Sequence, residues 1–296
     1  ASIFYATLKA KAILDENYTV TNGDATSTSV LVANDGANVE IASGKTLTTN
    51  TNVGLIATRG EGASASTSVA ENKGTLESTR TEKGIGIYTT FAIGKNSGTI
   101  TMDNKEAVGM LATIGSTLIN SSKIELKGIS SAGMYGENSD LTNGAGSQIV
   151  VNKAASAGMY AKMTGASSVP KTSKNEGKIE IIADGAGKSA AMYSRMESGS
   201  TAKLTTENTG TIEVAQEASV GIFADNVSGQ ASGQSEVLNS GLVKMTGIKS
   251  VGIIGKKSKV TNSGTGTNGI EISGTGSAGI LATDKSEVIN SGRIEG

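Results

Sequence analysis

Residues 96–120 read NSGTITMDNKEAVGMLATIGSTLIN and hold one full period of a repeat that extends over most of the chain. The period opens on an Asn-Ser-Gly corner and closes on the next asparagine. Between them lie three short pieces, 100–102, 108–113 and 116–120, in which apolar residues alternate with others. Such alternation, punctuated by glycine and asparagine, is typical of short strands joined by tight turns.

The same signatures recur along the chain. The closing asparagines follow one another at intervals of 23 to 33 residues, and they are Asn72, Asn96, Asn120, Asn143, Asn175, Asn208, Asn239, Asn262 and Asn290. A second signature, Val/Ala-Gly-Ile/Met followed by Tyr, Leu, Ile or Phe, lies between them. Its glycines are Gly54, Gly86, Gly109, Gly133, Gly158, Gly221, Gly252 and Gly279, with Ala191 replacing one.

Three short strands per period predict an all-β fold, a right-handed parallel β-helix of about ten coils. Each coil is stable only when stacked on its neighbours. We expect residues 1–36 to form the start or cap of the solenoid, and residues 37–296 to form its coils, truncated mid-coil at the C-terminus. An open sheet edge invites aggregation, so we also expect further coils in the parent protein.

Composition excludes several functions. The 26 basic residues balance 27 acidic ones, so no basic face for nucleic acid is predicted. The chain contains neither cysteine nor histidine, which excludes disulfides, Cys or His metal sites and His-based catalysis. No apolar run is long enough to span a bilayer as a helix. We expect no metal, no cofactor and no membrane contact by this segment.

The asparagine row has two interpretations. Asparagine tolerates left-handed backbone geometry and hydrogen-bonds nearby backbone groups, which suits a tight corner. Stacked amides can also bond to one another along the rod. A structural role is the favoured interpretation, and ligand contact is the alternative.

The second strand offers a candidate binding stripe. If Val108, Met110 and Ala112 point inward, then Gly109, Leu111 and Thr113 point outward. An aromatic and apolar row then lies outside, with a row of charged residues of both signs beside it that could pair between coils. The stripe consists of Tyr135, Tyr160, Tyr193, Phe223, Lys162 and Arg195. The alternatives are that a bend at glycine turns the row into the core, or that insertions cover it.

Two further features have simple interpretations. A row of glutamates, with lysines and an arginine nearby, alternates outward from the Ile-x-Val strands and is most simply a solvated charged face: Glu77, Glu125, Glu180, Glu213, Glu271 and Glu295. Four periods carry about seven extra residues between the second and third strands, near 60–66, 165–171, 196–202 and 228–234. Insertions at equivalent positions project from one edge of the rod, which is often a binding face; tolerated loop drift is the alternative.

The Asn-x-Gly-x-Ile-x-Val and Ala-Gly-Ile/Met-Tyr-Ala repeat resembles the passenger domains of type V autotransporters, most closely the very large adhesins of fusobacteria. The resemblance covers the chain from about residue 37 onward. It implies a rod at the bacterial cell surface, on the extracellular face of the outer membrane, in a parent protein anchored by a β-barrel. It also implies a glycan or protein receptor on host cells or other bacteria as the partner.

Three functions remain open at this point. The first is an adhesin segment that binds through the stripe and the insertions. The second is a structural stalk that displays a binding tip elsewhere. The third is a polysaccharide-degrading enzyme, which is disfavoured because the chain has no histidine and no evident carboxylate cluster. We therefore expect no enzymatic activity.

Overall fold

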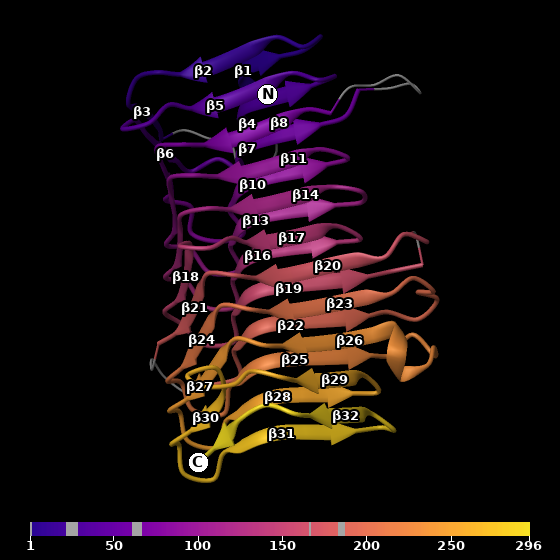
Figure 1. Ribbon diagram of the computed structural model, residues 1–296. Helices are drawn as coiled ribbons and strands as arrows, with labels where there is room; N and C mark the ends of the chain where they lie inside the picture. Colours follow the sequence, from indigo (N-terminus) through magenta and orange to yellow (C-terminus); the bar gives the residue numbers. More distant parts are fainter. Residues whose placement is uncertain (1, 22–28, 61–66, 166, 183–186) are drawn as a thin grey trace.

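The computed structural model describes residues 2–296 apart from 22–28, 61–66, 166 and 183–186. The chain winds into a rod with three long parallel sheets along its sides (Figure 1). Each sheet contains eleven strands, and every third strand in the sequence joins the same sheet. At about 4.8 Å between strands the rod is roughly 48 Å long. The predicted all-β parallel solenoid is confirmed.

Sheet A contains the strands with the Val/Ala-Gly signature. They are β1 (Ser2–Ala6), β4 (Ser29–Asn34), β7 (Val53–Thr58), β10 (Ile85–Thr90), β13 (Val108–Thr113), β16 (Ala132–Glu137), β19 (Ala157–Met163), β22 (Ala190–Met196), β25 (Val220–Asn226), β28 (Val251–Lys256) and β31 (Ala278–Thr283).

Sheet B contains the strands that close on asparagine. They are β2 (Lys11–Leu14), β5 (Asn38–Ile41), β8 (Val69–Asn72), β11 (Ile93–Asn96), β14 (Thr117–Asn120), β17 (Asp140–Asn143), β20 (Lys171–Asn175), β23 (Leu204–Asn208), β26 (Ser235–Asn239), β29 (Lys259–Asn262) and β32 (Glu287–Asn290).

Sheet C contains the Ile-x-Val strands. They are β3 (Tyr18–Val20), β6 (Thr46–Thr49), β9 (Thr75–Ser78), β12 (Thr99–Met102), β15 (Lys123–Leu126), β18 (Gln148–Val151), β21 (Lys178–Ile181), β24 (Thr211–Val214), β27 (Leu242–Met245), β30 (Gly269–Ile272) and β33 (Ile294–Glu295). A single 3-10 helix, Ser232–Gln234, interrupts the described loops.

The core is a set of aliphatic and methionine rows that run along the rod. Ile100, Ile124 and Ile149 of sheet C are fully buried and stand in register. Met110, Met134 and Met159 of sheet A face them from the other side. At the end of the sheet C row, Ile270 is fully buried, whereas Ile294 in the next strand is 43% exposed.

The first coil lies within residues 1–36. Strands β1, β2 and β3 pair with β4, β5 and β6 in the same three sheets. This coil has neither the closing asparagine nor the Val/Ala-Gly pair, so the sequence repeat did not reveal it. Residues 1 and 22–28 of this segment lie outside the described part.

The insertions lie at the corner between sheets A and B. Three of them follow one another in consecutive coils, after β19, β22 and β25, and in Figure 1 these loops project beyond the shorter turns above and below. The fourth follows β7, and its residues 61–66, like residue 166 of the second, lie outside the described residues.

Candidate functional site

The outer face of sheet A carries the predicted stripe. Tyr135, Tyr160, Tyr193 and Phe223 stand in one row across β16, β19, β22 and β25, paired coil to coil. Their side chains are half-buried, as are those of Leu111 and Ile254 in the same row. The row therefore faces outward and is not part of the core, while its rings bury much of their area against one another.

The predicted alternation was wrong at the start of these strands. Val108 is half-exposed and Gly109 is buried, so Gly109 and Met110 both face inward. A Cβ atom on Gly109 would lie 2.8 Å from Ile124 Cγ2 and 2.7 Å from the carbonyl oxygen of Gly133. The glycine is needed because the beginning of sheet A passes close to the isoleucine row of sheet C.

The four rings form a continuous stack, called here the aromatic ladder: Tyr135, Tyr160, Tyr193 and Phe223. The rings of Tyr160 and Tyr193 have centroids 4.7 Å apart and planes 24° from parallel. Phe223 stacks on Tyr193 at 5.1 Å, whereas Tyr135 meets Tyr160 edge to face at 4.9 Å. Each such pair contributes about 0.5–1.5 kcal/mol beyond its buried area.

The ladder changes the ionisation of its tyrosines. Burial raises the pKa of Tyr135 to about 12, and the charge of Glu137 adds to the shift. Burial also raises the pKa of Tyr160 to about 12, with a further contribution from Tyr193. Both hydroxyls therefore remain neutral hydrogen-bond donors across the physiological pH range.

We expect two tyrosines to ionise near pH 12 in the folded protein and near pH 10 once it is unfolded. Because the folded pKa lies above the unfolded one, the stabilisation is complete below about pH 10 and is lost as pH rises toward 12. A tyrosinate absorbance titration with and without denaturant measures both values. Tyr160→Phe should remove one late-ionising group. Ionisation of all tyrosines near pH 10 in the folded protein would contradict the assignment.

A row of ion pairs lies beside the ladder, toward the insertions. Lys162 Nζ is 3.2 Å from Glu137 Oε2. Arg195 contacts Asp225 Oδ2 at 2.8 Å and Glu197 Oε1 at 2.9 Å. Hydrogen bonds to Tyr193 and Glu197 raise the pKa of the Arg195 guanidinium. Both predicted cationic residues therefore hold their charge in ion pairs on the protein itself.

On the other side of the ladder lies a hollow of about 630 Å³, which we call the trough. Its floor consists of Ala132, Ala157 and Ala190, the first outward residues of three consecutive sheet A strands. The aromatic ladder forms one wall. The turns that precede the strands form the other, with Ser130, Ala155, Lys188 and Ala218. Val108 and Val220 occupy the floor position in the coils before and after.

The turn wall is built from residues in the left-handed region. The φ angles are 57° at Ser130, 56° at Ala155, 69° at Lys188 and 50° at Ala218. Stacking holds them there, since the amide of Ser130 donates to Ala154 O at 3.1 Å and that of Lys188 donates to Ala218 O at 3.1 Å. Non-glycine residues adopt this geometry only where the surroundings impose it, so the wall is continuous and rigid.

The trough was not predicted, although the sequence contains a signal for it. The pair that opens these strands is Val-Gly or Ile-Gly in five coils, including those of Val108 and Val220. It is Ala-Gly at Ala132 and Ala157, and Ala-Ala at Ala190. Three consecutive small residues at one outward position, between Val108 and Val220, create a depression in the row. None of the insertion residues that the structure describes lines it.

The asparagine row lies inside the rod. Each side-chain Nδ2 donates to Oδ1 of the next asparagine, as from Asn96 to Asn120 at 2.8 Å and from Asn120 to Asn143 at 2.7 Å. Eight such links of 2.7–2.8 Å join the nine predicted residues. All except Asn290 in the last complete coil are buried. Their amides bond to each other and to the backbone.

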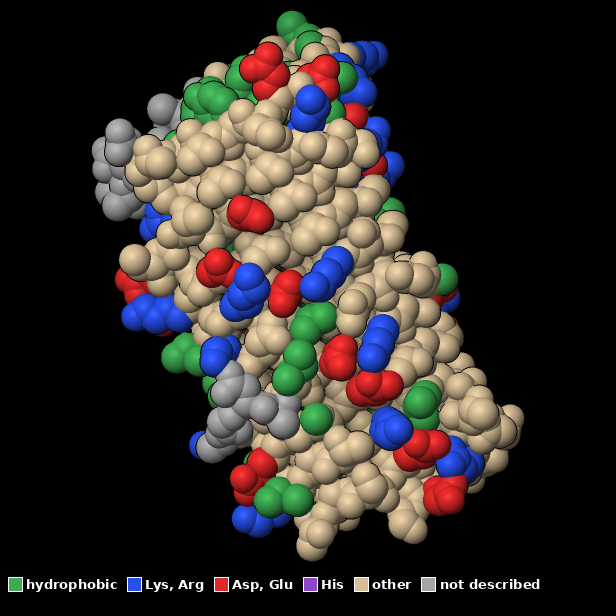
Figure 2. Space-filling model, turned by 90° about the vertical axis from the view of Figure 1, so that its left-hand side faces the viewer, with side chains coloured by type: hydrophobic (Ala, Val, Ile, Leu, Met, Phe, Trp, Pro, Cys, Tyr) green, Lys and Arg blue, Asp and Glu red, His purple; other side chains and the backbone are tan. Residues whose placement is uncertain are grey.

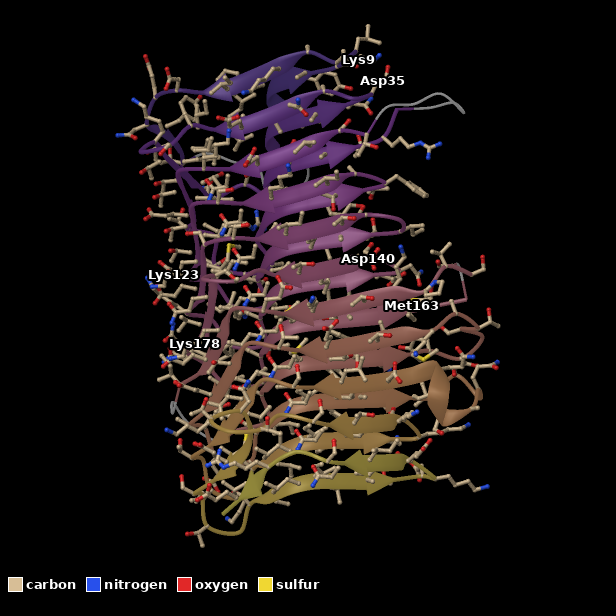
Figure 3. All side chains as sticks on the ribbon, in the orientation of Figure 1. Lys9, Asp35, Lys123, Asp140, Met163 and Lys178 are labelled. Carbon is tan, nitrogen blue, oxygen red and sulfur yellow. The ribbon has the colours of Figure 1, made fainter. Side chains whose placement is uncertain are left out.

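The outer face of sheet C carries charged residues of both signs. In Figure 2 the acidic and basic side chains are interspersed and do not gather by sign. Lys123 and Lys178 point outward from this sheet in Figure 3. Lys123 is 2.9 Å from Glu125, and Lys178 is 2.8 Å from Glu213. Within the described ranges, no group of three or more acidic, His or Cys side chains could hold a metal ion.

One protein-family model matches most of the chain. The model of the BigA third pectate lyase-like domain matches residues 11–251, about four fifths of the sequence. The chain belongs to this family. The BigA-type match includes the whole aromatic ladder and the whole trough. The family is a domain of a bacterial surface protein, which fits an autotransporter-like passenger. The fusobacterial resemblance stays a prediction.

Searches of curated proteins and of solved structures identified no further relative of this BigA-type domain. No curated protein and no solved structure matches the chain. Among the residues that the structure describes, no helix is long and apolar enough to cross a bilayer.

Proposed function

We propose that this BigA-type domain is a passenger segment of a cell-surface adhesin, carried on the extracellular face of a bacterial outer membrane. It binds a glycan or protein receptor on host cells or other bacteria through the outer face of sheet A. The aromatic ladder beside the trough is the observation that supports this proposal. Half-exposed aromatic rings next to a hollow are typical of interaction sites.

A purely structural stalk is the competing function. The regular stacking of the coils and the internal ion pairs on sheets A and C would serve a stalk equally well.

Catalysis has less support. The family description refers to a pectate lyase-like fold, and a fold does not determine chemistry. We propose that the domain is not an enzyme, since the ion pairs along sheet C spread the carboxylates over a solvated face.

The adhesion proposal is tested by binding of the labelled protein to epithelial cells, to bacteria and to a broad glycan array. We expect Tyr160→Ala combined with Arg195→Ala to lower binding about tenfold or more, because central aromatic and arginine residues dominate binding energy. Tyr88→Ala is the matched control, since Tyr88 occupies the same strand position in β10 but lies outside the ladder and the trough.

Circular dichroism should verify that each variant retains its β-structure. Loss of binding in the double variant alone would support the sheet A face as the contact region. Equal binding by the wild type, the double variant and the control would contradict the proposal and favour the stalk.

A further inference from the structure

The trough presents the edges of the aromatic rings. The faces of Tyr160 and Tyr193 cover each other at 4.7 Å, and Phe223 covers the other side of Tyr193 at 5.1 Å. In the ladder those faces are occupied, so the wall offers an apolar, edge-on surface along the rod.

The polar groups beneath the trough are engaged in hydrogen bonds within their turns and between neighbouring coils. Ser131 and Ser156 donate their hydroxyls to Ile129 O and Ala154 O, both at 3.1 Å. Each hydroxyl also accepts the amide of the preceding coil, as Ser156 Oγ does from Ser131 N at 3.0 Å. An extended peptide in the trough would therefore find few partners for its own backbone groups, which is unfavourable.

One charged group remains at the edge of the trough. Lys188 is exposed on the turn wall, and its ammonium group forms no ion pair within the described ranges. An apolar channel with one cation at its edge matches a ligand with an apolar chain and one anionic head.

The dimensions of the trough fit a single extended acyl chain. From the coil of Lys188, three coil steps lead over Ala190, Ala157 and Ala132 to Val108, about 14 Å at the strand spacing. The hollow of about 630 Å³ falls within the roughly 300–1,000 Å³ of small-molecule sites.

We propose that the trough binds a free fatty-acid carboxylate of about the length of dodecanoate. The acyl chain lies along Ala190, Ala157 and Ala132, with the carboxylate at Lys188. This ligand brings no backbone amides that would need partners. The inference does not depend on adhesion.

The test is a calorimetric titration of the 296-residue chain with dodecanoate below its critical micelle concentration. Tyrosine fluorescence provides a second signal, because the chain has no tryptophan. We expect saturable one-to-one binding. Ala157→Leu should weaken it about tenfold or more, because the larger side chain fills the floor.

Ala278→Leu is the matched control for the floor. Ala278 stands at the same position of β31 but is exposed and lies outside the trough, so its variant should bind within about twofold of wild type. The head group is tested with Lys188→Ala, which should weaken dodecanoate about fivefold, the scale of an exposed ion pair, and leave dodecanol unchanged. Lys249→Ala is the control for Lys188→Ala, because Lys249 occupies the equivalent turn before β28, two coils further along the rod.

Two outcomes would overturn the inference. One is the absence of saturable dodecanoate binding to the folded protein. The other is equal weakening by Ala157→Leu and Ala278→Leu, which would indicate nonspecific adsorption. Receptor binding is measured separately on cells and glycans, so failure of one proposal leaves the other standing.

Discussion

Replacing Asn120 by alanine should lower the free energy of unfolding by about 3–5 kcal/mol. Asn120 is fully buried, donates to Asn143 Oδ1 and Ser122 O, and accepts from Asn96 Nδ2 at 2.8 Å. Alanine removes these three buried hydrogen bonds, although Asn96 Nδ2 keeps a backbone carbonyl and Asn143 Oδ1 keeps a serine hydroxyl as second partners. Each lost buried bond costs roughly 1–3 kcal/mol. Urea denaturation followed by circular dichroism measures the loss.

Asn290→Ala is the control for this change. Asn290 ends the same row but is exposed in its coil, and it accepts from Asn262 at 2.7 Å. Water can replace its bonds, so we expect a loss below about 1 kcal/mol. Similar losses for Asn120→Ala and Asn290→Ala would mean that the row contributes little to stability.

Replacing Gly210 by alanine should destabilise the protein by about 3 kcal/mol or more, at the upper end of overpacking effects. A Cβ atom at Gly210 would overlap the carbonyl oxygen of Gly177 in the preceding coil. The corner would have to move away from the preceding coil. The hydrogen bonds from Gly210 N to Asn175 O and from Thr211 N to Gly177 O would then lengthen. The thermal midpoint should fall accordingly.

Gly233→Ala provides the comparison. Nothing lies within 4 Å of a Cβ atom at Gly233, in the insertion after β25. We therefore expect a change within about 0.5 kcal/mol, as for surface positions elsewhere. A stable Gly210→Ala variant with an unchanged midpoint would show that the corner can separate without loss, contrary to the packing described here.

The fold could be predicted because its main determinant is local and repeated. A corner such as Asn96-Ser97-Gly98, followed by alternating apolar residues, occurs in almost every coil. The first coil, β1 to β3, has no such corner. It adopts the same path because the open edges of β4, β5 and β6 provide hydrogen-bond partners. Sequence alone gives no sign of that pairing.

The candidate site could be predicted only in part. The outward position of Tyr160 and Tyr193 followed from period-two alternation along the second strand. The same counting was wrong for Val108 and Gly109, because two consecutive inward residues arise from the contact with Ile124, which is distant in sequence. The trough is a property of three neighbouring coils together, and it becomes visible only when Ala132, Ala157 and Ala190 are aligned in space.

The direction of the inter-coil hydrogen bonds has a mechanical consequence. In all three sheets these bonds join neighbouring coils and therefore lie along the rod, while the covalent chain runs around it (Figure 1). Tension along the rod loads the bonds of a single terminal coil before those of the next. A released coil of 28 residues, such as that from Asn262 to Asn290, adds about 95 Å of contour length at some 3.4 Å per residue. The rod would then yield in steps, lengthening under flow while the coils around the trough remain folded.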